Sequence, residues 1–100
     1  MDRVFLINVF EVPTDREQEF LGLWEAADEL MRRSSGYVTT RLHRELSRTE
    51  RLRFVNVAEL RSAEHWQSIV GSDEFRRLAA RMADFHPAPG LYTVAREQRT

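Results

Sequence analysis

Residues 3–17 read RVFLINVFEVPTDRE and join two signals for secondary structure. Up to Val12, apolar residues occupy both faces of an alternating pattern, which predicts a strand over residues 3–12 that is covered on both sides. Pro13 ends the ladder, and Thr14 and Glu17 are spaced as in a capping box, in which each side chain satisfies a backbone donor of the other. The stretch therefore predicts a buried strand followed by a helix that begins at Thr14.

An amphipathic helix is expected directly after this box. Its apolar residues recur at helical spacing, and Ser34-Ser35-Gly36 supplies the stop. The apolar stripe, which needs a sheet to lie on, consists of Phe20, Leu23, Trp24, Ala27, Leu30 and Met31.

The remaining chain predicts three more strands and two more helices. Residues 37–45 and 52–60 are expected to form an antiparallel pair of strands joined by the polar connection 46–50. Ser62 is expected to cap a short helix that Gly71 ends, and Ser72 to cap a longer one. The segment HPAPG, residues 86–90, predicts a turn, and residues 91–97 a last strand. The order β-α-β-β-α-β is the ferredoxin-like arrangement of the α+β class, expected as one domain over residues 1–100.

One face of the predicted sheet is left apolar. A ferredoxin-like sheet carries helices on one side, so its other side should be polar if it meets water. If Asn8 and Asn56 face the helices, the opposite face carries Phe5, Ile7, Val9, Val55 and Val57. Burying that face against a second copy predicts a homodimer, a dimeric α/β barrel whose pocket lies within each protomer between sheet and helices.

The composition excludes several classes of chemistry. The chain has no Cys, which excludes disulfides, thiolate zinc sites, iron–sulfur clusters and a Cys nucleophile. All fifteen basic residues are Arg, so Schiff-base and P-loop lysines are excluded as well. The net charge of −1 gives no basic field for nucleic acid, and no apolar run approaches the roughly 20 residues of a membrane span. A cytoplasmic protein that binds neither nucleic acid nor membrane is expected.

Two amides interrupt otherwise apolar strands, at Asn8 and Asn56. Burying an amide without a hydrogen-bond partner costs about 1–3 kcal/mol of folding free energy. Each Asn side chain is therefore expected to make either a structural hydrogen bond or a hydrogen bond to a ligand. Trp24 and Trp66 are expected on the inner faces of their helices. Each could either pack in the core or form an aromatic wall for a flat ligand, and the sequence leaves both alternatives open. Two amides on one sheet face, with Trp66 near them, favour a pocket.

No metal or cofactor is expected. His43, His65 and His86 fall on a strand, a helix and a turn, without the spacing of a metal-binding pair such as His-x-x-x-His. The chain also lacks a Gly-x-Gly-x-x-Gly, a Gly-x-Ser-x-Gly and a Walker motif, so no device for binding a nucleotide or flavin is visible.

Four stretches together carry a resemblance to a known family. They are residues 7–13 (INVFEVP), 35–38 (SGYV), 54–66 (FVNVAELRSAEHW) and 72–75 (SDEF). In this order, over nearly the whole chain, the sequence resembles the antibiotic biosynthesis monooxygenase domain of the dimeric α/β barrel superfamily.

The resemblance implies catalytic roles for two residues. The cofactor-free anthrone oxygenases of this family have an Asn on the third strand and an aromatic residue at the start of the next helix, which match Asn56 and Trp66. Asn56 would donate to an enolate oxygen and Trp66 would form a wall, while the family's Trp four residues after the Asn is Leu60 here. The residues expected to contact substrate are Asn8, Trp24, Leu42, Phe54, Leu60 and Met82.

The haem-degrading branch of the family matches less well. Its strand Asn corresponds to Asn8, but its Trp and its axial His fall on Ile69 and Ala79. Haem degradation is therefore not expected.

The reaction implied by the resemblance uses the substrate as its own electron donor. An anthrone loses a proton to give an enolate, which passes an electron to O2, and the resulting peroxide loses water to leave a quinone. Two other functions stay open on the residues alone: an oxygen-independent cyclase or isomerase that holds an enol with the same amides, and a non-catalytic dimer that binds a hydrophobic metabolite.

Overall fold

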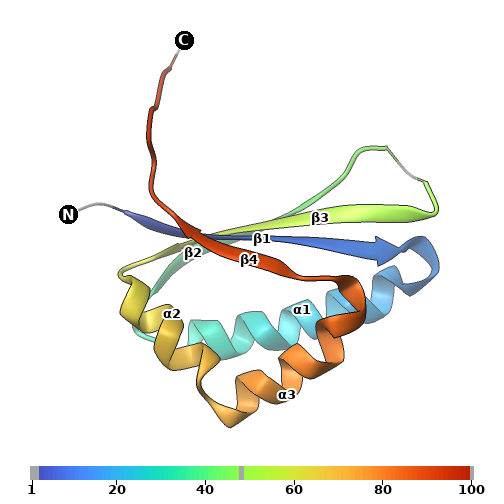
Figure 1. Ribbon diagram of the computed structural model, residues 1–100, viewed down its shortest axis with the longest axis horizontal. Helices are drawn as coiled ribbons and strands as arrows, with labels where there is room; N and C mark the ends of the chain where they lie inside the picture. The colour runs from blue at the N-terminus through green and yellow to red at the C-terminus, as the bar shows by residue number, and fades with distance from the viewer. Residues whose placement is uncertain (1–2, 48, 100) are drawn as a thin grey trace.

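The computed structural model describes residues 3–47 and 49–99 as four strands, three α-helices and two short 3₁₀ turns (Figure 1). In chain order these are β1 (Val4–Pro13), η1 (Thr14–Arg16), α1 (Glu17–Arg32), β2 (Tyr37–Arg44), β3 (Arg51–Leu60), α2 (Ala63–Val70), α3 (Asp73–Met82), η2 (Ala83–Phe85) and β4 (Ala88–Tyr92). The predicted α+β, ferredoxin-like order is confirmed, including the division of the second helical segment into α2 and α3.

The sheet is antiparallel throughout, in the order β2-β3-β1-β4. The two central strands, β1 and β3, pair over their whole length from Val4 opposite Leu60 to Pro13 opposite Arg51. All three helices lie against one face of the sheet, below it in Figure 1, and leave the other face uncovered. Because alternate residues of a strand point to opposite faces, β1 and β3 each supply one set of side chains to each side.

Two apolar clusters fill the space between sheet and helices. The ring of Phe20 on α1 organises the first, with centroids 4.9 Å from Phe10 and from Phe54 and 5.4 Å from Phe85. Burying one such side chain stabilises the fold by about 1.5–3 kcal/mol. The first cluster consists of Phe10, Val12, Phe20, Leu23, Leu52, Phe54, Met82 and Phe85, and the second of Leu6, Met31, Ala58, Leu60 and Ile69.

The start of α1 differs from the predicted capping box. The Thr14 hydroxyl donates to the Thr49 carbonyl, and the Thr14 backbone N–H donates to the Glu50 carbonyl at 2.9 Å. The Glu17 carboxylate is buried and pairs with Arg44 at 2.5 Å. The capping box was wrong because both side chains find partners far along the chain, so the α-helix begins at Glu17 instead.

The caps of the later helices divide in the same way. Ser72 caps α3 as predicted, since its hydroxyl accepts from the Phe75 N–H at 3.2 Å. Ser62 precedes α2 but makes no capping hydrogen bond. Its hydroxyl lies 2.8 Å from Nδ1 of His65, which is the partner that competes with the cap.

The last strand lies earlier than predicted. β4 ends at Tyr92, so the predicted turn over residues 86–90 overlaps it and residues 93–97 lie outside the sheet. His86 makes the turn alone, with a left-handed φ of 51°. The one proline of β4, Pro89, is tolerated because β4 is an edge strand, where a missing N–H breaks no second ladder. Beyond β4 the exposed chain runs away from the helices (Figure 1).

The uncovered face of the sheet is apolar at its centre, as the alternation predicted. The side chains of β1 and β3 on this face are half-buried, namely Phe5, Ile7, Val9, Val55 and Val57. At its border Arg3 pairs with Glu59 at 2.9 Å. No helix among residues 3–47 and 49–99 is long and apolar enough to cross a membrane.

Candidate functional site

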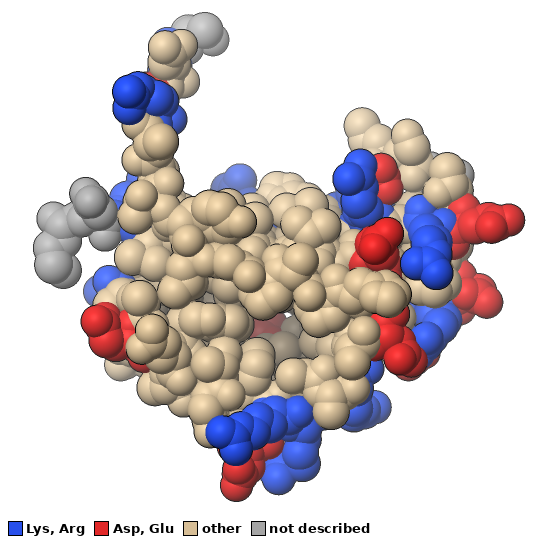
Figure 2. Space-filling model, viewed as in Figure 1, with Lys and Arg blue, Asp and Glu red and all other residues tan. Residues whose placement is uncertain are grey.

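A hollow of about 70 Å³ lies between the sheet and the helices. Figure 2 shows it as an opening in a largely uncharged surface. Side chains of both apolar clusters border it, so it lies where the core is divided. Its described lining consists of Leu6, Asn8, Phe10, Trp24, Ala27, Asp28, Met31, Tyr37, Thr40, Asn56, Ala58, Trp66, Phe75 and Met82.

The sheet side of the hollow carries the two amides, which lie directly opposite each other on β1 and β3. The Asn8 carbonyl oxygen Oδ1 accepts from the Ala88 backbone N–H of β4 at 2.9 Å. The Asn56 Oδ1 accepts from the Thr40 hydroxyl of β2, also at 2.9 Å. Since β4 and β2 flank the central pair on opposite sides, the two amide oxygens point away from each other.

This arrangement leaves the two amide nitrogens on the side of the β1–β3 pair that faces the helices. Directly opposite residues of an antiparallel pair have Cβ atoms about 4.5–5.5 Å apart, so the nitrogens of Asn8 and Asn56 can donate to one shared acceptor. Neither nitrogen has a hydrogen-bond partner within the part of the chain that the structure describes. The structural hydrogen bond that the sequence raised as one alternative is present for each amide at its oxygen, and the nitrogen of each amide keeps its two donor protons.

A tyrosine and an aspartate lie at the other side of the hollow, where β2 meets α1. The Tyr37 hydroxyl donates to Asp28 Oδ1 at 2.6 Å, and Arg32 Nε pairs with Asp28 Oδ2 at 3.1 Å. Burial raises the pKa of the Tyr37 phenol, and the hydrogen bond to Asp28 raises it further. At neutral pH Tyr37 is therefore a protonated donor and Asp28 its acceptor.

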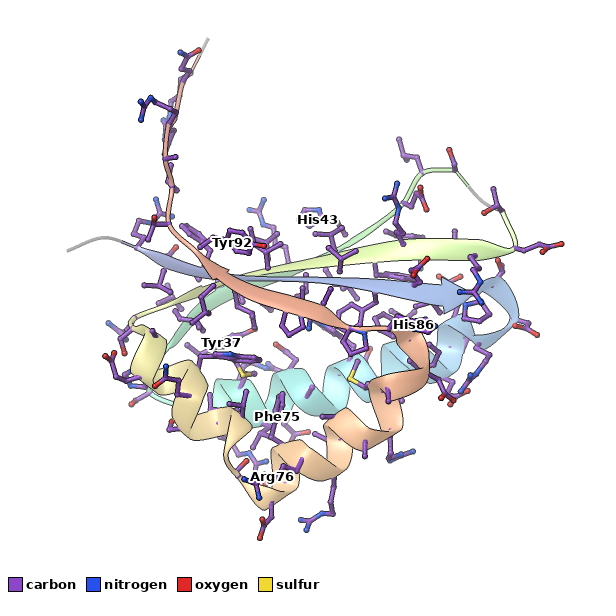
Figure 3. All side chains as sticks on the ribbon, viewed as in Figure 1. Tyr37, His43, Phe75, Arg76, His86 and Tyr92 are labelled. Carbon is purple, nitrogen blue, oxygen red and sulfur yellow. The ribbon has the colours of Figure 1, made fainter. Side chains whose placement is uncertain are left out.

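Aromatic side chains from the helices form the wall opposite the amides. Trp24 comes from α1, Trp66 from α2 and Phe75 from α3, and the last two rings meet edge to face with centroids 5.6 Å apart. Figure 3 shows Tyr37 between the sheet and the helices, and Phe75 below it at the level of the helices. A flat ring seated here would contact aromatic side chains on one side and two amide donors on the other.

The structure brings five of the eight predicted site residues to the hollow: Asn8, Trp24, Asn56, Trp66 and Met82. The other three lie in or against the surrounding core. Phe54 and Leu60 are buried in the first and second cluster, and Leu42 packs against the first. These three side chains therefore pack behind the lining of the hollow and are not part of the lining itself.

Sequence reasoning missed Asp28, Tyr37 and Thr40. One signal was available for Asp28, which lies one turn after Trp24 and therefore on the inner side of α1. Tyr37 and Thr40 gave no such signal, since their partners are fixed only when β2 pairs with β3 and packs against α1.

The three histidines lie apart. His43 projects from the uncovered face of the sheet and His86 lies at the turn before β4 (Figure 3), while His65 pairs with Ser62. Among the residues that the structure describes, no group of three or more His, Asp or Glu side chains could hold a metal ion.

Comparison with known proteins places this chain in one family. A model of the antibiotic biosynthesis monooxygenase family matches residues 3–81. No curated protein matches the chain.

Solved structures share the fold. SnoaB, a cofactor-independent oxygenase from Streptomyces nogalater, is 21% identical over 98% of this chain and 97% of its own, with a TM-score of 0.81. A candidate monooxygenase from Shewanella loihica PV-4 is 28% identical over 96% of this chain and 97% of its own, with a TM-score of 0.74. A conserved protein from Methanosarcina mazei Go1 is 18% identical over 92% of each chain, with a TM-score of 0.77. From the match to more than three quarters of its length, the chain belongs to the antibiotic biosynthesis monooxygenase family.

Proposed function

We propose that this protein is a cofactor-independent monooxygenase that uses O2 to oxidise a small aromatic polyketide of the anthrone type to a quinone, in the synthesis of antibiotics or related metabolites. Membership of the family and the oxygenase neighbours support a monooxygenase-type function. One observation carries the proposal furthest, namely the pair of amide nitrogens on the sheet side of an aromatic hollow.

The two amides act on the oxygen where charge develops. Loss of a proton from the central ring of an anthrone places negative charge on its carbonyl oxygen. Donation from Asn8 and Asn56 to that oxygen stabilises the enolate, and removing one such preorganised donor costs about 2.7–4 kcal/mol of transition-state stabilisation. Trp24 and Trp66 hold the ring and keep water from it.

The oxygen chemistry needs no other electron donor. The enolate transfers one electron to O2, and the two radicals combine to a peroxide on the central ring. The peroxide loses water, so that one oxygen atom stays on the ring as the new quinone carbonyl and the other leaves as water. The four electrons that reduce O2 all come from the substrate.

The hollow must widen to take such a substrate. Its volume of about 70 Å³ is about half of the roughly 150 Å³ of an engineered cavity that binds a single benzene ring. The wall formed by α2 and α3 is more able to move than α1, because these two helices have one buried residue each and α1 has four. Outward movement of Trp66 would enlarge the hollow and leave the two amides on the rigid central strands.

The test is O2 uptake by the metal-stripped protein with 1,8-dihydroxyanthrone, followed together with quinone absorbance. The proposal expects one quinone per O2, at a rate well above autoxidation, and a loss of about 10²–10³ in kcat for Asn56→Ala. His43→Ala, on the uncovered face, serves as the matched control and keeps the wild-type rate. Binding of the anthrone without O2 uptake would contradict the proposal and favour an oxygen-independent cyclase or isomerase, or a non-catalytic binding protein.

We further propose that the protein is a homodimer whose subunits pack through the uncovered sheet faces. The half-buried apolar centre of that face supports this, as does the exposed apolar chain next to it: Leu91 (37% exposed), Tyr92 (52%) and Val94 (51%). In Figure 1 this segment rises on the uncovered side of the sheet, where a second copy would lie. Such a dimer would leave each hollow within its own protomer.

A further inference from the structure

The proposed reaction requires a group that accepts the substrate's proton. The amides of Asn8 and Asn56 cannot do this at neutral pH, since an amide has no basic lone pair on its nitrogen. Among the lining residues that the structure describes, Asp28 and Tyr37 are the ionisable ones. The hollow therefore contains one carboxylate and one phenol to which the proposed function has so far assigned no role.

The geometry favours the carboxylate as the acceptor. The 2.6 Å distance between the Tyr37 hydroxyl and Asp28 Oδ1 is typical of a hydroxyl that donates to an ionised carboxylate. The Tyr37 phenol resists ionisation for the reasons given above, so it is not the base. The Arg32 guanidinium, with Nε 3.1 Å from the second carboxylate oxygen, fixes the orientation of the carboxylate.

Asp28 is also positioned to serve the amides. Its side chain is only 13% exposed, so substrate rather than bulk water is its neighbour once the hollow is filled. Thr40 lines the same hollow as Tyr37, and its hydroxyl donates to Asn56 Oδ1 at 2.9 Å. Strand β2 therefore supplies both Tyr37, which holds the carboxylate, and Thr40, which holds an amide donor on the other side of the hollow.

We infer that Asp28 is the general base of this site, held in place by Tyr37 and Arg32 as positioning residues. The carboxylate takes the proton from the C–H bond of the central ring and becomes a neutral acid. The electron pair of that bond remains on the ring as the enolate, whose oxygen the two amides bind. The inference rests on the proposed function in needing an acidic C–H substrate, but the proton step itself uses no O2.

The proton step can be measured alone by mixing protein and 1,8-dihydroxyanthrone without oxygen, at mildly acidic pH, and following the absorbance of the enolate. The wild type forms the enolate, and Asp28→Asn forms it about 100-fold or more slowly, as is typical when a general base is removed. Tyr37→Phe keeps the carboxylate and slows the step less. Quenching of the fluorescence of Trp24 and Trp66 measures whether each variant still binds the anthrone.

Two substitutions in similar residues are the matched controls. Glu25→Gln removes an exposed carboxylate from the same helix, and Tyr92→Phe removes the hydroxyl of the other tyrosine, on the uncovered face. Both leave the rate of enolate formation unchanged.

Rescue by a small base separates a chemical role from a structural one. In Asp28→Ala, added formate restores enolate formation in proportion to its concentration, because the deleted side chain leaves room for a free carboxylate. A variant that failed only through lost packing would not respond to formate. Circular dichroism confirms that the variants compared are folded, and Asp28→Ala with formate decides the question if Asp28→Asn does not fold.

The outcomes separate this inference from the proposed function. Wild-type rates of enolate formation in Asp28→Asn, or no response of Asp28→Ala to formate, overturn the inference. An enolate that forms in the wild type, requires Asp28 and yet consumes no O2 supports the base and contradicts the monooxygenase. O2 uptake that is equal in wild type and Asp28→Asn supports the monooxygenase and overturns the base.

Discussion

The central strands β1 and β3 present two different faces, although both faces belong to the same two strands. On the inner face, the apolar rows of β1 and β3 are broken at one level by Asn8 and Asn56, and the core is divided there by a hollow. On the outer face, Ile7, Val9 and Val57 continue without such a break. A break in the pattern marks the place where a small polar atom can be bound, whereas an unbroken row suits another apolar surface.

The comparison predicts that a charge on the outer face has the largest effect. Val57→Glu places a carboxylate at the centre of the apolar row, where a second sheet would have to bury it without a partner. The expected result is a monomer at every accessible concentration, still folded and still able to bind an anthrone in its hollow. Sedimentation velocity measures the change, with Gln67→Glu, at an exposed position of α2, as control. A wild type that is itself monomeric would contradict the role given to this face.

A change on the inner face is expected to do the opposite. Asn56→Ala lowers kcat by about 10²–10³, because one preorganised donor to the enolate oxygen is lost. Association of the subunits is unchanged, since the side chain lies on the other side of the sheet from the interface. Steady-state O2 uptake and sedimentation velocity on the same sample check both halves of this prediction. A variant with wild-type kcat would remove the amide from the mechanism.

A smaller effect tests whether the anchoring of the amide matters. Thr40→Val keeps the shape of the side chain but removes the hydroxyl that donates to Asn56 Oδ1. The loss of one hydrogen bond, at about 0.5–1.5 kcal/mol, should lower kcat by about 2- to 10-fold with little change in KM. Thr39→Val, on the adjacent exposed residue, is the control and should match the wild type. Equal rates for the two variants would show that Asn56 is held without Thr40.

The smallest effect concerns the charged border of the outer face. Hydrogen bonding from Arg3 lowers the pKa of the Glu59 carboxyl below its ordinary value. The pair therefore stabilises the fold fully above the pKa of Glu59 in the unfolded chain, and this contribution is lost as the pH falls through the lower pKa of the folded state. Glu59→Gln should flatten the acid side of the stability profile slightly, because exposed pairs contribute little.

Urea midpoints over a series of pH values measure this last effect. Glu11→Gln changes an exposed carboxyl of β1 on the same outer face of the sheet; it is the control and should leave the acid side unchanged. A profile for Glu59→Gln identical to that of the wild type would show that the pair does not contribute.

The sequence predicted the parts of the molecule that depend on local periodicity. The alternation of β1 and β3 placed Asn8 and Asn56 on the helix side and Val57 on the other, because a period of two leaves no freedom once one face is buried. Ser72 was predicted as a cap for the same reason, since its partner Phe75 lies three residues away.

The parts that it missed depend on contacts between elements. Thr14 and Glu17 have the spacing of a capping box, but their partners lie in the β2–β3 connection and on β2. The hydrogen bond between Tyr37 and Asp28 forms only when β2 packs against α1, and no local sequence pattern predicts it. β4 was placed too late because Pro87, just before the strand, and Pro89, within it, indicate a turn unless the strand is known to lie at an edge.

A double-mutant cycle on the two amides tests the central claim most directly. O2 uptake with 1,8-dihydroxyanthrone gives kcat for the wild type, Asn8→Ala, Asn56→Ala and the double variant. If both nitrogens bind one enolate oxygen, each single change lowers kcat and the double change costs less or more than the sum of the two in free energy, by about 0.5–3 kcal/mol. Wild-type uptake no faster than autoxidation, or two single variants that match the wild type, would contradict the account.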